Sequence, residues 1–137
     1  MDDIPEGFKE ADFGGNFLKG NGPFYLCRAD RNWLVGMRVG EHHVNYLRIA
    51  HGGLLSTLAD VALSAQPFYS ERPNPAVTTT SMTTNFIAAA RLGDWLVADA
   101  RMARMGKRTA HVHGAIYRGD EVIMTMSGVF GIHRPDS

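Results

Sequence analysis

The stretch "HGGLLSTLAD", residues 51–60, begins with a histidine and two glycines and ends with a single acid. At 100° per residue, apolar side chains gather on one side of a helix and small polar ones gather on the other. The spacing predicts a helix of about four turns that stops near Gln66 and Pro67, because proline disfavours helical geometry in the preceding residue. The apolar side comprises Leu54, Leu55, Leu58, Ala59, Val61 and Ala62, and the polar side Gly53, Ser56, Thr57, Asp60 and Ser64.

Strand-forming stretches flank this helix. Residues 24–39 contain aromatic and β-branched residues on both sides of a polar cluster at 29–32, which predicts a hairpin. After the helix and a loop, four further stretches are typical of strands. They span residues 76–89, 95–105, 108–119 and 121–132, and Leu92-Gly93-Asp94, Gly106-Lys107 and Gly119-Asp120 between them are hairpin-turn signals.

The order hairpin, helix and four-strand meander predicts an α+β fold in which one antiparallel sheet wraps around one long central helix. A chain of 137 residues has the size of one domain, so we expect a single domain over residues 1–137. Six strands curled on a lone helix leave surface uncovered. We therefore expect dimerisation through the edge strands or across the helix.

The composition of the chain limits the kinds of molecule that it is expected to bind. The 14 Lys and Arg balance the 14 Asp and Glu, so no overall field attracts nucleic acid or an anionic membrane. The first residues are acidic and lack the apolar segment of a secretion signal, and no apolar run reaches the roughly 20 residues that cross a bilayer. With Cys27 as the single cysteine, these features predict a soluble cytoplasmic protein.

The start of the predicted helix offers chemistry. Main-chain N–H groups at His51-Gly52-Gly53 have no intrahelical partner, and they could stabilise a developing oxyanion. Alternatively, the glycines only permit a tight entry loop. Asp60 lies about 180° around the helix from His51, so the two cannot meet within one helix. Asp60 is then either a solvated acid or a group that approaches a partner's helix N-terminus.

Asn45, His51-Gly52-Gly53 and Asp60 together resemble the signature of hotdog-fold acyl-CoA thioesterases, and the nearest type is that of phenylacetate degradation. The resemblance implies a homodimer, usually paired into a homotetramer, with active sites shared between subunits. It implies that the Gly52 N–H polarises the thioester carbonyl and that Asn45 and His51 position the substrate or the loop. Asp60 of the other subunit would act as nucleophile or as general base on water.

The resemblance also places Thr79 near Asp60, where its hydroxyl could orient the attacking water, although threonine is common on strands for its β propensity alone. Family members carry a glycine midway between the asparagine and His-Gly-Gly. Residues 46–50 of this chain contain none, which puts the loop geometry and the role of Asn45 in question.

Cations near the Gly106 turn are candidates for binding the phosphates of CoA. These residues are Arg104, Lys107 and Arg108, and their alternative role is that of a solvated turn surface. His111 and His113 share a strand face, but the spacing matches no closed zinc site, so no metal is expected.

The predicted activity is hydrolysis of an acyl- or aryl-CoA thioester to a free acid and CoA, without a metal or redox cofactor. Two alternatives stay open. One is an acyl-thioester hydratase or dehydratase, which would need a paired histidine and acid. The other is a non-catalytic acyl-CoA binding module, in which Asp60 only meets solvent. The acyl group and the choice between dimer and tetramer also stay open.

Overall fold

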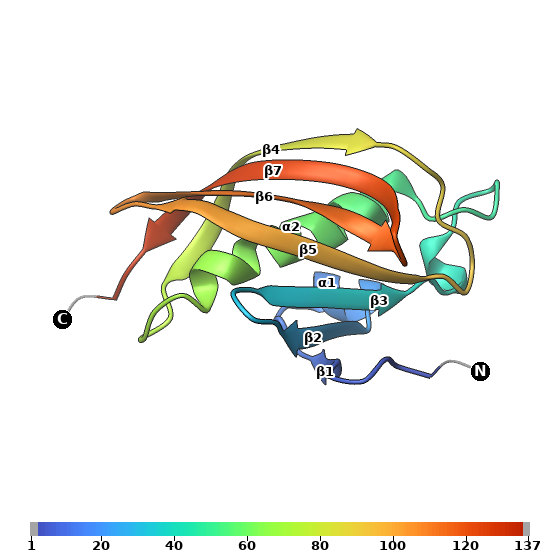
Figure 1. Cartoon of the computed structure of the whole chain (residues 1–137), viewed down its shortest axis with the longest axis horizontal. Coiled ribbons are helices and arrows are strands. Elements are labelled where there is room, and N and C mark those ends of the chain that lie inside the picture. The colour runs from blue at the N-terminus through green and yellow to red at the C-terminus, as the bar shows by residue number, and fades with distance from the viewer. Residues whose placement is uncertain (1–2, 136–137) are drawn as a thin grey trace.

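The computed structural model describes residues 3–135, in which an antiparallel sheet curves around one long helix (Figure 1). The α+β hotdog architecture predicted from the sequence is confirmed. The helices are α1 (Asn16–Asn21) and α2 (Gly52–Phe68), with a 3₁₀ turn η1 (Glu41–His43). The strands are β1 (Lys9–Ala11), β2 (Phe24–Arg28), β3 (Trp33–Arg38), β4 (Ala76–Phe86), β5 (Trp95–Met105), β6 (Thr109–Arg118) and β7 (Glu121–His133).

The helix α2 lies in the concave side of the sheet, and all six residues of its predicted apolar side are buried. Leu58, Ala59, Ala62 and Leu63 have no exposed area. They pack against the inward side chains of the sheet, where buried residues alternate along the strands. The helix includes Pro67 and ends at Phe68, one residue beyond the predicted end. Pro67 has no N–H to bond back into the helix, and the helix ends one residue later, where the N–H of Tyr69 donates to the Ala65 carbonyl at 3.0 Å.

The sheet order is β1-β2-β3-β5-β6-β7-β4, so the prediction of a four-strand meander is wrong for its first strand. β4 pairs with β7 from Ala76↔His133 to Phe86↔Met124, and it forms an edge of the sheet. Residues 92–94 therefore turn within a crossover, at Gly93 with φ 90°, and do not join paired strands. The reason is visible in the burial: most β4 side chains are exposed on both faces, which suits an edge and not a centre.

Two other turn predictions are confirmed. Gly106-Lys107 joins β5 to β6, and Gly119-Asp120 joins β6 to β7, in antiparallel pairs. The predicted hairpin of residues 24–39 corresponds to β2 and β3, which pair from Tyr25↔Gly36 to Arg28↔Trp33.

The N-terminal segment was not predicted to have regular structure, yet it supplies β1 and α1. The strand β1 pairs with β2 and raises the sheet from six strands to seven. The short helix α1 follows, its Leu18 packs against the core, and its Phe17 and Leu18 line one cavity together with residues of α2. Among residues 3–135, no helix has both the length and the apolar character needed to span a membrane.

Candidate active site

The N-terminus of α2 is capped by His51. Its backbone is extended at φ −62° and ψ 140°, and its Nδ1 accepts the N–H of Gly53 at 2.7 Å. The N–H of Leu55 donates to the His51 carbonyl at 3.1 Å, which begins the helix. Within residues 3–135 the N–H of Gly52 has no acceptor. The cap thus leaves Gly52 as an open donor at the positive end of the helix dipole.

The loop that precedes the helix is organised by Asn45. Its Oδ1 accepts the N–H of Leu47 at 2.9 Å and the N–H of Ile49 at 3.4 Å. Its main chain exchanges hydrogen bonds with Ile49 and Arg48. The side-chain oxygen of Asn45 is therefore used within its own loop, an arrangement typical of an Asx turn.

Arg48 explains how this loop forms without a glycine. It has φ 64°, a left-handed conformation that glycine adopts most readily. Its guanidinium group makes two hydrogen bonds to the carboxylate of Glu41, at 2.9 and 3.1 Å. The same contact lowers the pKa of the Glu41 carboxyl and keeps it charged. The exposed Arg48–Glu41 ion pair thus accompanies the left-handed backbone at Arg48, in the loop whose geometry the sequence leaves open.

Asp60 projects from the polar side of α2 and is half-buried. The hydroxyl of Thr79 donates to Asp60 Oδ1 at 2.6 Å, so the structure brings these two residues together as the resemblance implied. A β-bulge in β4 lies between Thr79 and Ser81, and bulges re-aim side chains next to such sites. Within residues 3–135, no second hydrogen bond or ion pair to this carboxylate is present. One oxygen of Asp60 is fixed, and the other is available for chemistry.

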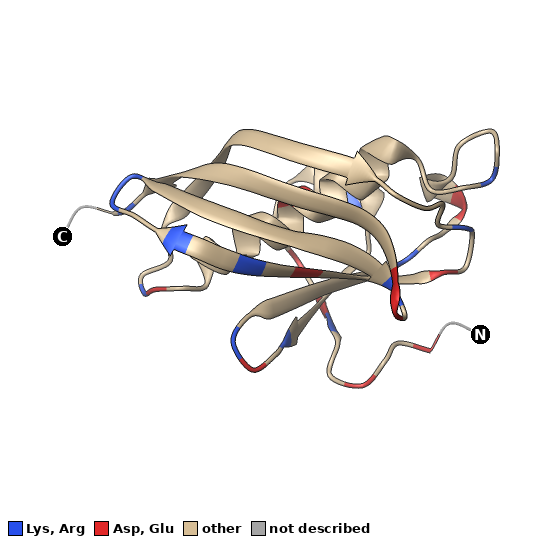
Figure 2. Ribbon diagram, turned by 45° about the horizontal axis from the view of Figure 1, so that its top comes forward, with Lys and Arg blue, Asp and Glu red and all other residues tan. Residues whose placement is uncertain are grey.

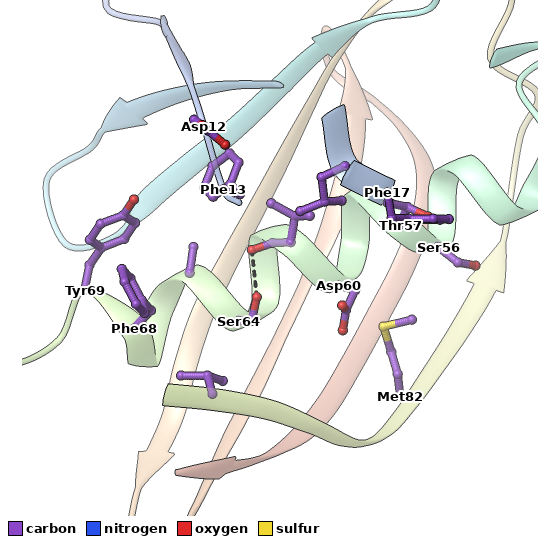
Figure 3. A pocket seen from close by; sticks show the side chains of 14 residues that line it. Asp12, Phe13, Phe17, Ser56, Thr57, Asp60, Ser64, Phe68, Tyr69 and Met82 are labelled. Carbon is purple, nitrogen blue, oxygen red and sulfur yellow. Dashed lines mark hydrogen bonds between the residues drawn. The ribbon is translucent and has the colours of Figure 1, made fainter. Parts of the chain in front are cut away.

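A cavity of about 660 Å³ opens across the polar side of α2, and Asp60 lies in its wall. Phe13 and Phe17 of the N-terminal segment border one edge, whereas Met82 of β4 borders another (Figure 3). Ser56, Thr57 and Ser64, small polar residues of the same helix side, also line it. The sequence interpretation missed Phe13 and Phe17, and their four-residue spacing is no helical signal, because Phe13 precedes α1 and is separated from it by Gly14 and Gly15, both with positive φ.

Gly52 and Asp60 do not meet within one chain. Eight residues of α-helix separate them, which is about 12 Å along the axis at 1.5 Å per residue. A single carbonyl carbon cannot contact both. His51 is also apart from Asp60, and its Nδ1 is occupied by Gly53. His51 and Asp60 therefore do not form, within one chain, the paired histidine and acid that a hydratase would need.

The cations Arg104, Lys107 and Arg108 lie at and beside the β5–β6 turn (Figure 2). Figure 1 shows this turn at the end of the sheet where α2 ends, opposite the end where Gly52 lies. Arg134, which sequence reasoning did not single out, donates to the carbonyls of Gly106 and Lys107 and pairs with Glu71 at 2.6 Å. It holds the turn in place.

His111 and His113 lie on the outer face of β6, away from the cavity beside Asp60. Within residues 3–135, no three His, Cys, Asp or Glu side chains gather closely enough to hold a metal ion.

The fold and the site define a hotdog protein with a carboxylate in the wall of a mostly apolar cavity. A family model described as the thioesterase superfamily matches residues 47–125, so the chain belongs to that superfamily. The resemblance drawn from Asn45, His51-Gly52-Gly53 and Asp60 is confirmed at this level, as is the prediction of a thioester hydrolase.

Two relatives by sequence illustrate the family. A Pseudomonas aeruginosa protein provisionally named an esterase is 38% identical over 95% of this chain and 98% of its own length. A Mus musculus protein named acyl-coenzyme A thioesterase 13 is 34% identical over 62% of this chain and 60% of its own length.

Solved structures share the fold. A phenylacetic acid degradation-related protein from Ralstonia eutropha superposes with a TM-score of 0.77, 16% identity and coverage of 86% of this chain and 91% of its own. A Streptococcus mutans protein, described as bound to acetyl CoA, gives a TM-score of 0.74, 20% identity and coverage of 83% and 91%.

Proposed function

We propose that this protein hydrolyses acyl-CoA thioesters to a free acid and CoA. The observation that carries the proposal is the 2.6 Å hydrogen bond from Thr79 to Asp60 in the wall of a cavity lined mostly by apolar residues. It leaves one carboxylate oxygen free to act on a thioester carbonyl or on water. The mouse relative named as an acyl-CoA thioesterase supports the substrate class.

Asp60 has two ways to perform the reaction. As a general base it takes a proton from water while the water oxygen attacks the carbonyl carbon. As a nucleophile it attacks the carbonyl itself, forms an anhydride and is released by water. In both routes the C–S bond breaks, and the departing sulfur leaves as the CoA thiolate or thiol. The Thr79 hydroxyl fixes Oδ1 of Asp60, so that only the other oxygen faces the reaction.

The Gly52 N–H has the complementary task. It is an open donor at a helix N-terminus, where it stabilises the negative charge that develops on the carbonyl oxygen. In this proposal Asn45 and His51 act on the loop: Asn45 organises it, and His51 fixes the direction of the next N–H. No metal and no bound redox cofactor takes part.

The separation of Gly52 from Asp60 supports a site shared by two subunits, with Gly52 from one and Asp60 from the other. The exposed edge strand β4 and the open polar side of α2 are the surfaces available for a second copy. We infer a homodimer or a homotetramer. In such an assembly the CoA phosphates are bound by the cations Arg104, Lys107 and Arg108. The cytoplasmic location expected from the sequence stays a prediction.

The first experiment measures thiol release from aryl-, short-chain and long-chain acyl-CoAs by wild type and Asp60→Asn. The asparagine keeps the size of the side chain and removes its basicity, so we expect turnover to fall by about a hundredfold to ten-thousandfold. Circular dichroism and sedimentation check that the variant is folded and assembled. Equal turnover in the two proteins contradicts the role of Asp60, and no turnover of any substrate by wild type contradicts the proposed activity.

A second experiment tests the shared site by complementation. Gly52 is the first helical residue, where proline is tolerated, and His51 already has the extended backbone that precedes proline. Gly52→Pro therefore removes one N–H with little other change. Co-expressed Gly52→Pro and Asp60→Asn chains form one intact site in each mixed dimer, so activity returns. If mixed dimers form and stay inactive, the two residues do not act in one shared site.

A further inference from the structure

The N-terminal segment forms part of the cavity beside Asp60. Asp12, Phe13, Phe17 and Leu18 all line that cavity. Phe13 and Leu18 also pack against the core, whereas Phe17 is 67% exposed. An exposed phenylalanine that borders a cavity contributes little to folding, and its apolar surface is available to an apolar ligand.

The end of α2 and the strand β4 contribute further apolar side chains to the walls of the cavity. Phe68 and Tyr69 at the end of α2, and Val77 and Met82 of β4, are apolar or aromatic. At about 660 Å³ the cavity lies within the roughly 300–1,000 Å³ of small-molecule sites, and an acetyl group would leave most of it empty. Its volume and its apolar lining residues favour a larger apolar group whose carbonyl reaches Asp60.

Two histidines that lie outside this segment form hydrogen bonds at its C-terminal end. The helix α1 has six residues and none of them is buried, so it cannot be stable by itself. His42 Nε2 lies 2.7 Å from the Gly22 carbonyl oxygen, and His43 Nε2 lies 2.7 Å from the Asn21 carbonyl oxygen. Each ring nitrogen donates to the carbonyl, and the two rings stack with centroids 3.8 Å apart.

The same histidine pair is connected to the start of α2. The N–H of Gly40 donates to His43 Nδ1 at 2.8 Å, which fixes the ring of this buried residue. The His43 carbonyl accepts the N–H of His51 at 2.9 Å. One short turn therefore sets both the end of α1 and the residue that caps α2.

We infer that residues 12–21 are the specificity-determining wall of the acyl site, that they select larger apolar acyl groups over acetyl, and that His42 and His43 are its positioning residues. This inference rests on the proposed function for its substrate. The inference differs from the proposed function because it assigns the choice of acyl group to a segment that takes no part in the chemistry.

The test compares wild type with Phe17→Ala on acetyl-, octanoyl- and phenylacetyl-CoA. Removing the exposed ring takes away apolar contact with the larger groups, so KM for octanoyl- and phenylacetyl-CoA should rise about tenfold while kcat changes little. The acetyl-CoA parameters should stay the same. Leu92→Ala, which shortens an exposed apolar side chain outside the cavity, is the matched control and should change none of these values.

His42→Phe tests the positioning role. The phenyl ring retains the stacking on His43 and loses the hydrogen bond to Gly22. We expect KM for the two larger substrates to rise about threefold, since a lost hydrogen bond is worth about 1 kcal/mol and part of it is recovered from water. An equal change for acetyl-CoA, or no change for any substrate, overturns the positioning role.

Binding separates this inference from the proposed activity. Calorimetry with ethyl- and octyl-CoA thioethers, which cannot be hydrolysed, measures affinity whether or not turnover occurs. Wild type should bind the octyl compound more tightly, and Phe17→Ala should lose about tenfold of that preference. Equal affinity of wild type for both thioethers, or a Phe17→Ala that weakens both equally or neither, overturns the inference even if thioesters are hydrolysed. An octyl preference without turnover overturns the proposed activity alone.

Discussion

The two sides of α2 meet different surroundings. The side that faces the sheet is sealed: Leu58 and Leu63 have no exposed area and contact the inward side chains of the strands. The other side carries Asp60 and small polar residues, is only half-buried and lines a cavity. One helix therefore supports folding with one side and, in the proposed function, carries the reactive carboxylate on the other, so substitutions on the two sides should have separable effects.

After Asp60→Asn, the largest effect on activity is expected at the open start of the helix. Gly52→Pro removes the N–H proposed as the oxyanion donor and should lower kcat by about a hundredfold to a thousandfold, with stability nearly unchanged. Gly52→Ala is the matched control: it keeps the N–H, and its Cβ would meet the Phe86 ring at an ordinary 3.5 Å. Steady-state thiol release compares the two. Equal loss in both variants would assign the effect to crowding by Phe86.

Substitutions on the side of α2 that faces the sheet should instead lower the free energy of unfolding. Leu58→Ala deletes buried methyl groups and leaves a cavity, so the free energy of unfolding should fall by about 2–5 kcal/mol. Ser56→Ala, on the polar side of the same helix, should change it by no more than about 0.5 kcal/mol. Urea denaturation measures both. A comparable loss in both variants would show that the polar side is also sealed in the protein's assembly.

A smaller effect on activity is expected from the partner of Asp60. Thr79→Val keeps the shape and removes the hydroxyl that donates to Asp60 Oδ1. We expect kcat to fall about tenfold, because one hydrogen bond to a charged group is worth roughly 1.5–3 kcal/mol and a solvent molecule replaces part of it. The neighbouring Thr80→Val is the control. An unchanged kcat in Thr79→Val would leave Asp60 without a positioning partner.

The smallest effect is a pH dependence of stability from His43. Burial lowers the pKa of this ring, which also accepts the Gly40 N–H on Nδ1 and so must be unprotonated there. The unfolded chain takes up a proton near pH 6.5, before the folded protein does, so stability is fully present above that pH. It should fall as pH decreases below about 6.5, until the folded ring is protonated as well.

Urea denaturation at a series of pH values, with NMR titration of the His43 ring, measures this dependence. A His43 that titrates at or above pH 6.5 in the folded protein would contradict it.

Much of the site could be predicted from local spacing. The helix start, the polar side with Asp60 and the meeting of Thr79 with Asp60 follow from periodicity and from the resemblance. The glycine-free loop could not be resolved that way, because the left-handed Arg48 is accompanied by an ion pair to Glu41, seven residues earlier. The wall formed by Phe13 and Phe17 was missed because α1 is too short to form without its tertiary contacts.

The resemblance carried by Asn45, His51-Gly52-Gly53 and Asp60 implied the class of chemistry. By itself the sequence determined the strands from β2 onward, the helix α2 and its amphipathic character. These features are local, since they depend on side-chain periodicity and on turn residues. Only the tertiary structure decided that β4 pairs with β7 and not β5, that a bulge aims Thr79 at Asp60 and that α1 borders the cavity. Each of these depends on contacts between segments distant in sequence, whose pairing is chosen by burial of the whole sheet around α2.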